Sequence, residues 1–394
     1  MYDLKCNIGE VKRALKRQIA VVTTSRADYS LLYWPLRELA AHPDIDLKLI
    51  ALGPHLSPEF GLTVREIERD GFQVDARIEC LLSSDTDVAM AKTIGIAAQS
   101  LADYLGQLRP DLLLLTADRY EMLAPAAVAL ALRIPIAHVE GGEVSEGAID
   151  DAVRNALTKL SHIHFTSTAL ARARVIAMGE EEWRVHQVGA PALEHLRRSP
   201  VLTREELESR LAIDLTLPTA IVTFHPATIA QDTTREAGAL FKALESVSGQ
   251  LLFCYPNADA GSRTLIRRLP PNAKVFVNLE PTAYWSLLGY VDLLIGNSSS
   301  GIIEAASFEL PVVNVGIRQR GREHGRNVLD AEATVESILA AIETARSSAF
   351  RQSLRGMENP YGDGHSAAKI ASVLATVEPG EKLLIKKAPH LAST

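Results

Sequence analysis

Cysteine is scarce in this chain of 394 residues, and the three cysteines present, Cys6, Cys80 and Cys254, lie far apart in the sequence. An odd number of cysteines at these separations builds neither the disulfide framework of a small secreted domain nor a zinc-binding spacing. The first eighteen residues also lack the apolar run of a signal peptide. We therefore expect a protein of a reducing compartment, namely the cytoplasm.

Long hydrophobic runs are missing as well, and no stretch approaches the roughly 20 apolar residues of a membrane span. The longest apolar run, from about Met122 to Leu132, is rich in alanine and predicts a buried helix. Positive charge is not in excess either, because the net charge is -7. This balance argues against broad binding of nucleic acid or of an anionic membrane. A local cluster of arginines can still hold phosphate groups within an acidic protein.

What the sequence contains in abundance is short apolar segments that alternate with amphipathic ones. Segments that are apolar on both faces and alternate with helices are typical of strands in a parallel sheet covered on both sides. The pattern predicts the α/β class, with two Rossmann-like domains whose parallel sheets face a cleft. The main strands are predicted at 19–24, 47–53, 111–117, 134–142, 219–226, 250–257, 273–278, 291–297 and 310–316.

The two halves of this pattern give the expected domain boundaries. The first domain is predicted at 19–197 and the second at 203–377, and the polar stretch from about 197 to 218 is the candidate linker. The last helix, at about 364–377, can pack back on the first domain. The two ends of the chain are expected to be terminal extensions, the second of them poorly ordered: 1–18 and 378–394.

A segment of glycine and serine, Gly296 to Gly301, joins a buried strand to a helix. Small residues let a ligand approach the backbone closely, and the free N–H groups at the start of a helix can bind a phosphate. The alternative is an ordinary serine N-cap that binds no ligand. The segment is not a Walker loop, because no lysine follows its second glycine. No GxGxxG follows the first strand, which argues against a nicotinamide enzyme.

Four arginines lie within nine residues, from Arg318 to Arg326, directly after the strand predicted at 310–316. An isolated run of this kind is usually a solvated basic loop. Here the run follows the strand next to the anion-binding candidate, and guanidinium groups bind a pyrophosphate in a bidentate manner. Arg26, which follows the first predicted strand, is a similar candidate from the other domain.

Carboxylates gather at the ends of the strands in the first half of the chain. Several carboxylates around one cleft can act as general acid and base when burial separates their pKa values. Two or three of them can instead merely cap helices, and a divalent-metal site is a less favoured alternative. His225 ends the strand predicted at 219–226, where it can protonate or hydrogen-bond a leaving group or be purely structural. The acidic residues are Asp118, Glu121, Glu140, Glu143, Asp150 and Asp151.

In this order, several segments resemble the hydrolysing UDP-N-acetylglucosamine 2-epimerases of sialic-acid biosynthesis, over about residues 19–330. The resemblance implies the two-Rossmann-domain arrangement called GT-B, and a reaction that needs no cofactor and no metal. Ala117 departs from the family pattern, which usually has glycine there, and we expect alanine to be tolerated if the backbone has a negative φ. The segments include ADRYEMLA, HVEGGEVSEGAIDDAVRNALTKLSHIHF, FHPAT, IGNSSSGIIEA and RQRGREHGRNV.

Carried over residue by residue, the resemblance implies acid and base roles for Asp118, Glu140 and Asp151, with Asp150 beside them. It leaves open which carboxylate is the base, and it implies that His225 lies near the phosphates or the sugar. Contacts to the UDP-sugar are implied for Arg26, Arg119, Asn257, Ser298, Ser299, Glu304, Arg318 and Arg322.

The implied reaction removes the C2 proton of UDP-N-acetylglucosamine while the bond from C1 to UDP breaks. Water then adds to the glycal, and N-acetylmannosamine is released. The same chemistry on UDP-2,4-diacetamido-2,4,6-trideoxyglucose, on the way to legionaminic acid, is an open alternative. A GT-B glycosyltransferase and a non-catalytic sensor of sugar nucleotides are two further alternatives. We expect a homodimer or homotetramer, with the UDP-sugar and water as its only other partners.

Overall fold

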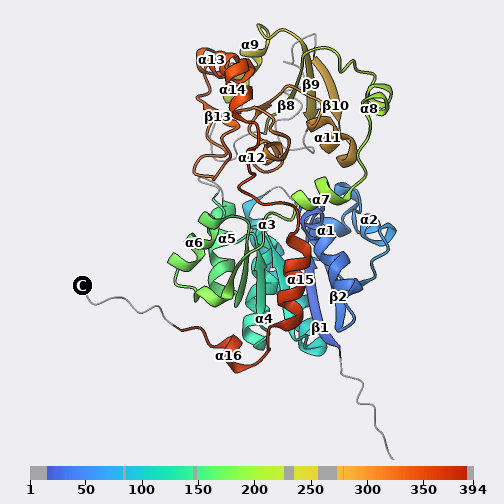
Figure 1. Ribbon diagram of the computed structural model, residues 1–394. Coiled ribbons are helices and arrows are strands. Elements are labelled where there is room, and N and C mark those ends of the chain that lie inside the picture. Colours follow the sequence, from blue (N-terminus) through green and yellow to red (C-terminus); the bar gives the residue numbers. More distant parts are fainter. Residues whose placement is uncertain are drawn as a thin grey trace, which may run out of the picture.

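The computed structural model describes residues 16–82, 86–144, 149–225, 235–255, 273–277 and 279–387. These residues form two α/β domains, and Figure 1 shows the first domain below and the second above. Each domain is built on one parallel sheet flanked by helices. The predicted fold class is therefore confirmed.

The sheet of the first domain has seven strands in the order β3-β2-β1-β4-β5-β6-β7, and every described pairing within it is parallel. The strands are β1 (Arg17–Thr23), β2 (Ile45–Leu52), β3 (Val74–Ile78), β4 (Leu112–Thr116), β5 (Ile136–Val139), β6 (Ile163–Thr166) and β7 (Val185–Gln187). The helices are α1 (Arg26–Ala41), α2 (Val64–Arg69), α3 (Asp87–Leu108), α4 (Leu123–Leu132), α5 (Ile149–Leu160), α6 (Ala169–Ala177) and α7 (Leu193–Arg198).

The sheet of the second domain has six strands in the order β10-β9-β8-β11-β12-β13, and its described pairings are also parallel. The strands are β8 (Thr219–Thr223), β9 (Gln250–Tyr255), β10 (Ala273–Val277), β11 (Leu293–Gly296), β12 (Val312–Val315) and β13 (Val328–Ala331). The helices that follow α7 are α8 (Arg204–Leu211), α9 (Arg235–Leu244), α11 (Pro281–Leu288), α12 (Ser299–Ile303), α13 (Val335–Arg346), α14 (Ser348–Ser353), α15 (Ser366–Thr376) and α16 (Glu381–Leu384).

In both sheets the strand order reverses in the middle, between β1 and β4 in the first and between β8 and β11 in the second. Chain segments that leave two such neighbouring strands diverge, and the crevice between them is where open α/β sheets bind ligands. The sequence motifs follow β1, β4, β5, β8 and β11 directly. The topology thus places them at the carboxyl ends of the two sheets.

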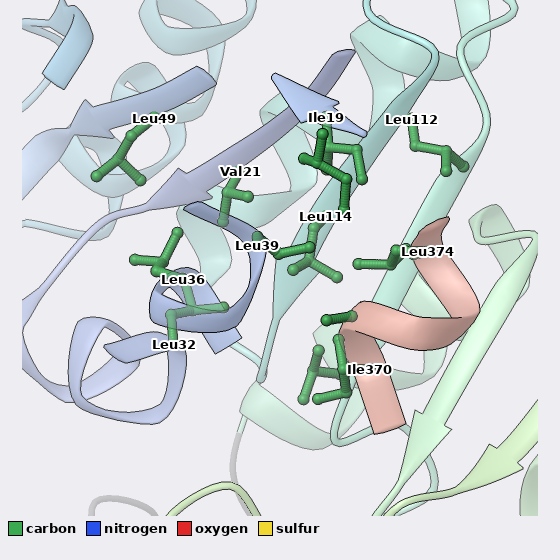
Figure 2. Packing of buried hydrophobic residues seen from close by; sticks show 14 of the residues in the cluster. Ile19, Val21, Leu32, Leu36, Leu39, Leu49, Leu112, Leu114, Ile370 and Leu374 are labelled. Carbon is green, nitrogen blue, oxygen red and sulfur yellow. The ribbon is translucent and has the colours of Figure 1, made fainter. Parts of the chain in front are cut away.

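Alternate residues of the central strands supply two separate apolar layers. Leu113 and Leu115 of β4 pack in one layer with residues of α3 and α4. Leu112 and Leu114 point to the opposite face and pack with residues of α1 and α15 (Figure 2). Because both faces of the strand are buried, the whole segment must be apolar, which explains its continuous run of leucines.

The helix α15 comes from the end of the chain and returns to the first domain. Its Ile370 and Leu374 join the apolar cluster that contains Leu36 and Leu39 of α1, as Figure 2 shows. The chain therefore crosses between the domains twice, once before α8 and once before α15.

The polar stretch that predicts a linker is folded in part. Residues 204–211 form α8, and the hydroxyl of Thr203 accepts a hydrogen bond from the N–H of Glu206 while the Glu206 carboxylate accepts one from the N–H of Thr203. Leu207 and Leu211 of this helix are buried in the core of the second domain. The sequence analysis predicted a linker here instead of a helix because most residues of α8 are charged and only one narrow stripe of it is apolar.

The prediction of a poorly ordered tail from residue 378 is wrong for the part that the structure describes. The segment up to 387 contains α16, and the ammonium of Lys386 lies 2.6 Å from the buried carboxylate of Glu180. The guanidinium of Arg184, which is fully buried, donates a hydrogen bond to the carbonyl of Leu383 at 2.7 Å. These long-range polar contacts leave no local pattern in the sequence.

The alanine-rich run beginning at about Met122 forms α4, whose inner face joins the apolar layer beneath α3. Among the residues that the structure describes, no helix combines the length and the apolar character needed to cross a membrane.

Candidate active site

The acidic motifs of the first domain meet around one basic side chain, Arg154. This arginine lies in α5 and is buried, and its guanidinium forms an ion pair with Asp118 at the end of β4. Its Nη1 atom lies 3.6 Å from the Asp151 carboxylate and donates a hydrogen bond to the carbonyl of Glu143 at 3.0 Å. One guanidinium therefore brings together residues from three separate segments.

Glu140 lies at the end of β5 and is buried beside this group. Burial, together with the negative charge of Glu143, raises the pKa of Glu140 to about 7, although Arg322 acts in the opposite direction. A carboxyl group with a pKa near neutrality can both accept and return a proton, which is the property required of a general acid–base group. Burial and the nearby Asp118 also raise the pKa of Asp150.

Two non-glycine residues at these strand ends adopt the left-handed backbone conformation. Ala117 has a φ of 58° and Glu140 has a φ of 66°. The condition on which we expect alanine to be tolerated at 117, a negative φ, is therefore not met. Such conformations cost of order 1–3 kcal/mol and persist where the surrounding structure enforces them, which happens most often at functional sites.

A close approach of backbones explains the second glycine of the EGGE turn. Gly142 has a φ of 80°, and a side chain there would place its Cβ only 2.3 Å from the carbonyl oxygen of Ala171. Glycine is required at this position for packing against α6, and it allows Glu140 and Glu143 to approach the same space.

Asn297 is the centre of the anion-binding candidate in the second domain. Its side-chain amide donates to the carbonyl of His225 at 2.8 Å and its amide oxygen accepts from the N–H of His225 at 2.7 Å. Its own carbonyl accepts hydrogen bonds from Arg318 at 2.8 Å and from Gln319 at 2.9 Å. The ends of β8, β11 and β12 are thereby fixed relative to one another.

The strand before Asn297 approaches its neighbour so closely that only glycine fits. Gly296 has a φ of 141°, and a Cβ there would lie 1.8 Å from the carbonyl oxygen of Thr223. Ser298 caps the following helix by accepting a hydrogen bond from the N–H of Ser300. The helix α12 has only five residues, so a phosphate would be bound by its free N–H groups more than by a helix dipole.

Three further residues predicted at the site lie at this turn or in the elements joined to it: His225, Ser299 and Glu304. His225 lies at its edge, and burial, aided by the charge of Arg318, lowers the pKa of its imidazole to about 3. A neutral imidazole at physiological pH is better suited to hydrogen bonding than to protonating a leaving group. Ser299 is the first residue of α12, and Glu304 is its C-cap, where burial raises the pKa of the carboxyl.

Arg119 and Arg26 are the two arginines of the first domain for which substrate contacts are predicted. Arg119 donates to the buried carboxylate of Glu121 at 2.7 Å, which holds its guanidinium at the end of β4. Arg26 is exposed at the start of α1, on the rim of a groove of about 790 Å³ that also contains Trp34 and Trp285. Asn257, the remaining predicted contact, lies outside the described residues.

Contacts between the domains join the acidic turn after β5 to the arginine loop after β12, away from that groove. The Nε atom of Arg322, in the second domain, lies 3.4 Å from the carboxylate of Glu143 in the first. The phenol of Tyr361 donates to the carbonyl of Glu323 at 2.8 Å, and its oxygen lies 3.4 Å from the same carboxylate. The predicted residues Glu140 and Arg322 are therefore brought near each other, whereas Arg26 lies on another rim.

Several buried polar atoms in the segments that carry the predicted site residues have no hydrogen-bond partner among the described residues. Native proteins contain few such atoms, and a bound ligand or an ordered water molecule is one explanation for an atom of this kind. They lie at strand ends, in the loops that follow, or at the end of α12: Thr116 Oγ1 and Glu143 Oε1 in the first domain, and Thr223 Oγ1, Glu304 Oε2 and Glu323 Oε2 in the second.

Two parts of this arrangement were not identified from the sequence as site residues, namely Arg154 and Asn297. Arg154 follows Asp151 by three positions and directly follows Val153 on the buried side of α5. The sequence did contain a signal for Arg154. It is a basic residue one helical turn after an acidic pair, on a helix face that is otherwise apolar. Asn297 belongs to the GNSSSG segment, but its hydrogen bonds with His225 depend on β8 and β11 being neighbours in the sheet. Within the described residues, no group of three or more His, Cys, Asp or Glu side chains could hold a metal ion.

Comparison with known proteins identifies the family. The family profile described as UDP-N-acetylglucosamine 2-epimerase matches residues 37–375. The chain is 37% identical to the GDP/UDP-N,N'-diacetylbacillosamine 2-epimerase (hydrolyzing) of Campylobacter jejuni, over 86% of this chain and 89% of the relative. It is 36% identical to the UDP-N,N'-diacetylbacillosamine 2-epimerase (hydrolyzing) of Legionella pneumophila, over 94% and 98%.

A UDP-N-acetylglucosamine 2-epimerase of Neisseria meningitidis is 31% identical, over 84% of this chain and 87% of the relative. A crystal structure of UDP-GlcNAc 2-epimerase from the same species, bound to UDP-GlcNAc, superposes with a TM-score of 0.79 at 16% identity, covering 91% of this chain and 99% of that one. The superposition supports the two-domain fold that the resemblance implies. The chain belongs to the UDP-N-acetylglucosamine 2-epimerase family of enzymes.

Proposed function

We propose that the protein is a hydrolysing 2-epimerase of a UDP-linked 2-acetamido sugar. The observation that carries this proposal is the buried turn of Glu140 and Glu143, which contacts Arg154, the ion-pair partner of Asp118, and Arg322 of the other domain. In that turn the pKa of Glu140 is raised to about 7. Moving a carbon-bound proton requires a base that is desolvated and close to the substrate. The breaking bond to a diphosphate requires positive charge at the leaving group.

The first stage of the reaction is an elimination. A carboxylate takes the proton from C2 of the sugar, the C–H electron pair forms the C1–C2 double bond, and the bond from C1 to the diphosphate oxygen breaks. The products are a glycal and UDP. Glu140 is suited to one proton transfer of the cycle, and Asp118 or Asp151, both held by Arg154, is suited to the other.

The second stage returns the elements of water to the glycal. The hydroxyl group of a water molecule adds at C1. A proton is delivered to C2 on the face opposite to the face from which the first proton was removed. The net reaction consumes one water and releases UDP and a free sugar with inverted configuration at C2. No oxidation or reduction occurs in either stage, so the scheme includes no redox cofactor and uses the protein's arginines to stabilise the leaving UDP.

The UDP part is proposed to lie on the second domain. Ser298 and Ser299 present hydroxyl and N–H groups after β11, and Arg318 is held next to them by the carbonyl of Asn297. The buried Oε2 atom of Glu304 has no hydrogen-bond partner among the described residues. It is suited to accept hydrogen bonds from the ribose hydroxyls. Arg26 and Arg119 would contact the substrate from the first domain.

For the sugar, we propose the 2,4-diacetamido-2,4,6-trideoxy compound, UDP-N,N'-diacetylbacillosamine. Support comes from identities of 37% and 36% to two relatives named for that substrate, against 31% to the relative named for UDP-N-acetylglucosamine. UDP-N-acetylglucosamine is the second candidate, because that relative also matches most of the chain.

The test is incubation of EDTA-treated protein with each UDP-sugar separately in D₂O, followed by NMR. We expect UDP and a free 2-epimerised sugar carrying deuterium at C2, with the higher kcat/KM for the diacetamido substrate. A higher kcat/KM for UDP-N-acetylglucosamine would reverse the order of the two substrates. A released sugar without deuterium at C2 would contradict the elimination. Release of no sugar from either compound would favour a glycosyltransferase or a sensor.

A further inference from the structure

Glu143 is the acidic residue of the first domain whose polar contacts come largely from the second half of the chain. It is buried in the turn after β5, and the side chains that approach its Oε2 atom are Arg322 and Tyr361, both at 3.4 Å. Its other oxygen, Oε1, is buried without a hydrogen-bond partner among the described residues. A carboxylate that only supported its own turn would be bonded to nearby backbone N–H groups, and no such bond is described here.

A buried charge of this kind is costly unless an opposite charge compensates it. For Glu143 the compensating charge is Arg322, which belongs to the loop after β12 of the other domain. The two groups meet only when the domains are in the arrangement seen here. A movement that separated the domains would leave both groups to be solvated by water.

The rest of the domain contact favours the same arrangement. Arg174 of α6 donates to the carbonyl of Gly142, next to Glu143, at 3.3 Å and to the carbonyl of Gly321, next to Arg322, at 3.4 Å. Tyr361 is fully buried where the chain returns to the first domain, and its carbonyl accepts a hydrogen bond from the N–H of Ala190 at 2.7 Å. The two loops that carry Glu143 and Arg322 are thus held together from both sides.

Glu140 lies three residues before Glu143 in the same turn. The charges of both Glu143 and Arg322 act on the pKa of Glu140. Burial has the largest effect on its pKa; the Glu143 charge also raises the pKa, and the Arg322 charge lowers it. The charged groups that face Glu140 are Glu143, Arg322, Asp118 and Arg154. Of these four, Arg322 alone comes from the second domain.

We propose that Glu143 is a positioning residue for the epimerase reaction: it docks Arg322 of the second domain beside Glu140, so that domain closure completes the charge environment of the carboxyl group that transfers the proton. The inference rests on the proposed function, in which Glu140 changes its protonation state during turnover. In the open arrangement Glu140 would face a carboxylate without the arginine, and proton abstraction would be disfavoured until the substrate is enclosed.

The test is the pH dependence of kcat/KM in three variants of the full-length protein. Glu143→Gln removes a negative charge near Glu140 and also releases Arg322. These two losses act on the pKa of Glu140 in opposite directions, so the acidic limb should move by much less than about one pH unit. Arg322→Gln removes the positive charge while Glu143 keeps its negative one, so the acidic limb should move to higher pH by about one unit. Tyr361→Phe, the matched control, removes a hydroxyl without changing any charge and should leave the midpoint in place.

If Glu143 did not dock Arg322, the arginine would stay beside Glu140 in Glu143→Gln, and the acidic limb of that variant would move to lower pH by about one unit, the effect of the lost negative charge alone. Unshifted limbs in an active Arg322→Gln protein overturn the inference, even if Glu143→Gln fails to fold. Failure of the wild type to release a deuterated sugar is a different result, because it overturns the proposed function itself.

Discussion

The guanidinium of Arg154 forms an ion pair with Asp118, a residue 36 positions earlier in the loop after β4, and so ties α5 to the carboxyl end of the sheet. The same guanidinium lies 3.6 Å from Asp151 on its own helix. Two of the proposed catalytic carboxylates therefore have their positions fixed by one buried arginine. Their separation depends on α5 rather than on the flexible geometry of a loop.

We predict that Arg154→Gln lowers both turnover and stability. Removing one partner of a buried ion pair leaves the other charge poorly compensated, so the free energy of unfolding should fall by about 3 kcal/mol. The misplaced carboxylates should reduce kcat by about 10²-fold. Urea unfolding and steady-state kinetics measure the two effects. The matched control is Arg172→Gln, which breaks the exposed pair with Glu182 and should change stability by less than about 1 kcal/mol. Equal effects of the two substitutions would contradict this role of Arg154.

Ala117→Gly should stabilise the protein, because Ala117 has a φ of 58°. Glycine adopts that conformation without the clash of a Cβ atom, and the relief exceeds the entropy that glycine adds to the unfolded chain. We expect the free energy of unfolding to rise by about 0.5–1 kcal/mol. Ala137→Gly, within the regular strand β5, is the control and should lower it by a similar amount. A loss of stability in Ala117→Gly would mean that the methyl group contributes more by packing than the backbone strain costs.

The strands at the centre of each sheet could be predicted from the sequence because both of their faces are buried. Leu112 to Leu115 can be continuously apolar only in such a strand, and the run stands out without any tertiary information. The turn that ends β11 was recognisable for a similar reason, since small residues such as Gly296 are required where two backbones nearly touch. Edge strands were harder, and β3 and β13 were missed because they span only four or five residues and are interrupted by partly or fully exposed positions.

The pairing of site residues could not be predicted in the same way. Tyr361 meets Glu143 across 218 positions of sequence, and Arg322 meets it from a different domain. Such contacts depend on the strand order and on the return of α15, neither of which leaves a local pattern. The strain at Ala117 was hidden for another reason, because alanine, unlike glycine or asparagine, does not indicate a left-handed backbone.

Arg318→Gln should weaken the binding of UDP. Arg318 donates to the carbonyl of Asn297 at 2.8 Å, which holds its guanidinium beside the proposed phosphate site. Loss of one charge-assisted contact should reduce the binding free energy of UDP by about 1–3 kcal/mol, which calorimetry can measure. Arg320→Gln, two residues away and exposed, carries the same change of charge and should have little effect. Equal losses in both variants would indicate a diffuse electrostatic effect instead of a specific site.

Glu140→Gln should separate the chemistry from substrate binding. Glutamine keeps the size of the side chain but cannot accept a proton, so kcat should fall by about 10²-fold or more, while the affinity for UDP should stay close to that of the wild type. In the wild type, kcat/KM should rise with pH to a plateau, with a midpoint set by the pKa of Glu140 near 7. Unchanged turnover in Glu140→Gln would exclude this residue as an acid–base group.

The same substitution should also change how stability depends on pH. The pKa of Glu140 is about 7 in the folded protein, above the ordinary value of 4.5, because its charged form is buried near Glu143. The unfolded chain therefore releases this proton at lower pH than the folded chain, and the wild type loses stability as the pH rises from about 4.5 to about 7. Glutamine carries no proton to release, so the stability of Glu140→Gln relative to the wild type should increase across that window and stay constant above it. Urea unfolding of both proteins at pH 5 and pH 8 tests this directly. A difference in stability that is equal at the two pH values would show that the charged form of Glu140 is well compensated in the folded state, and a general base poised near neutrality would then have to be sought among the other carboxylates.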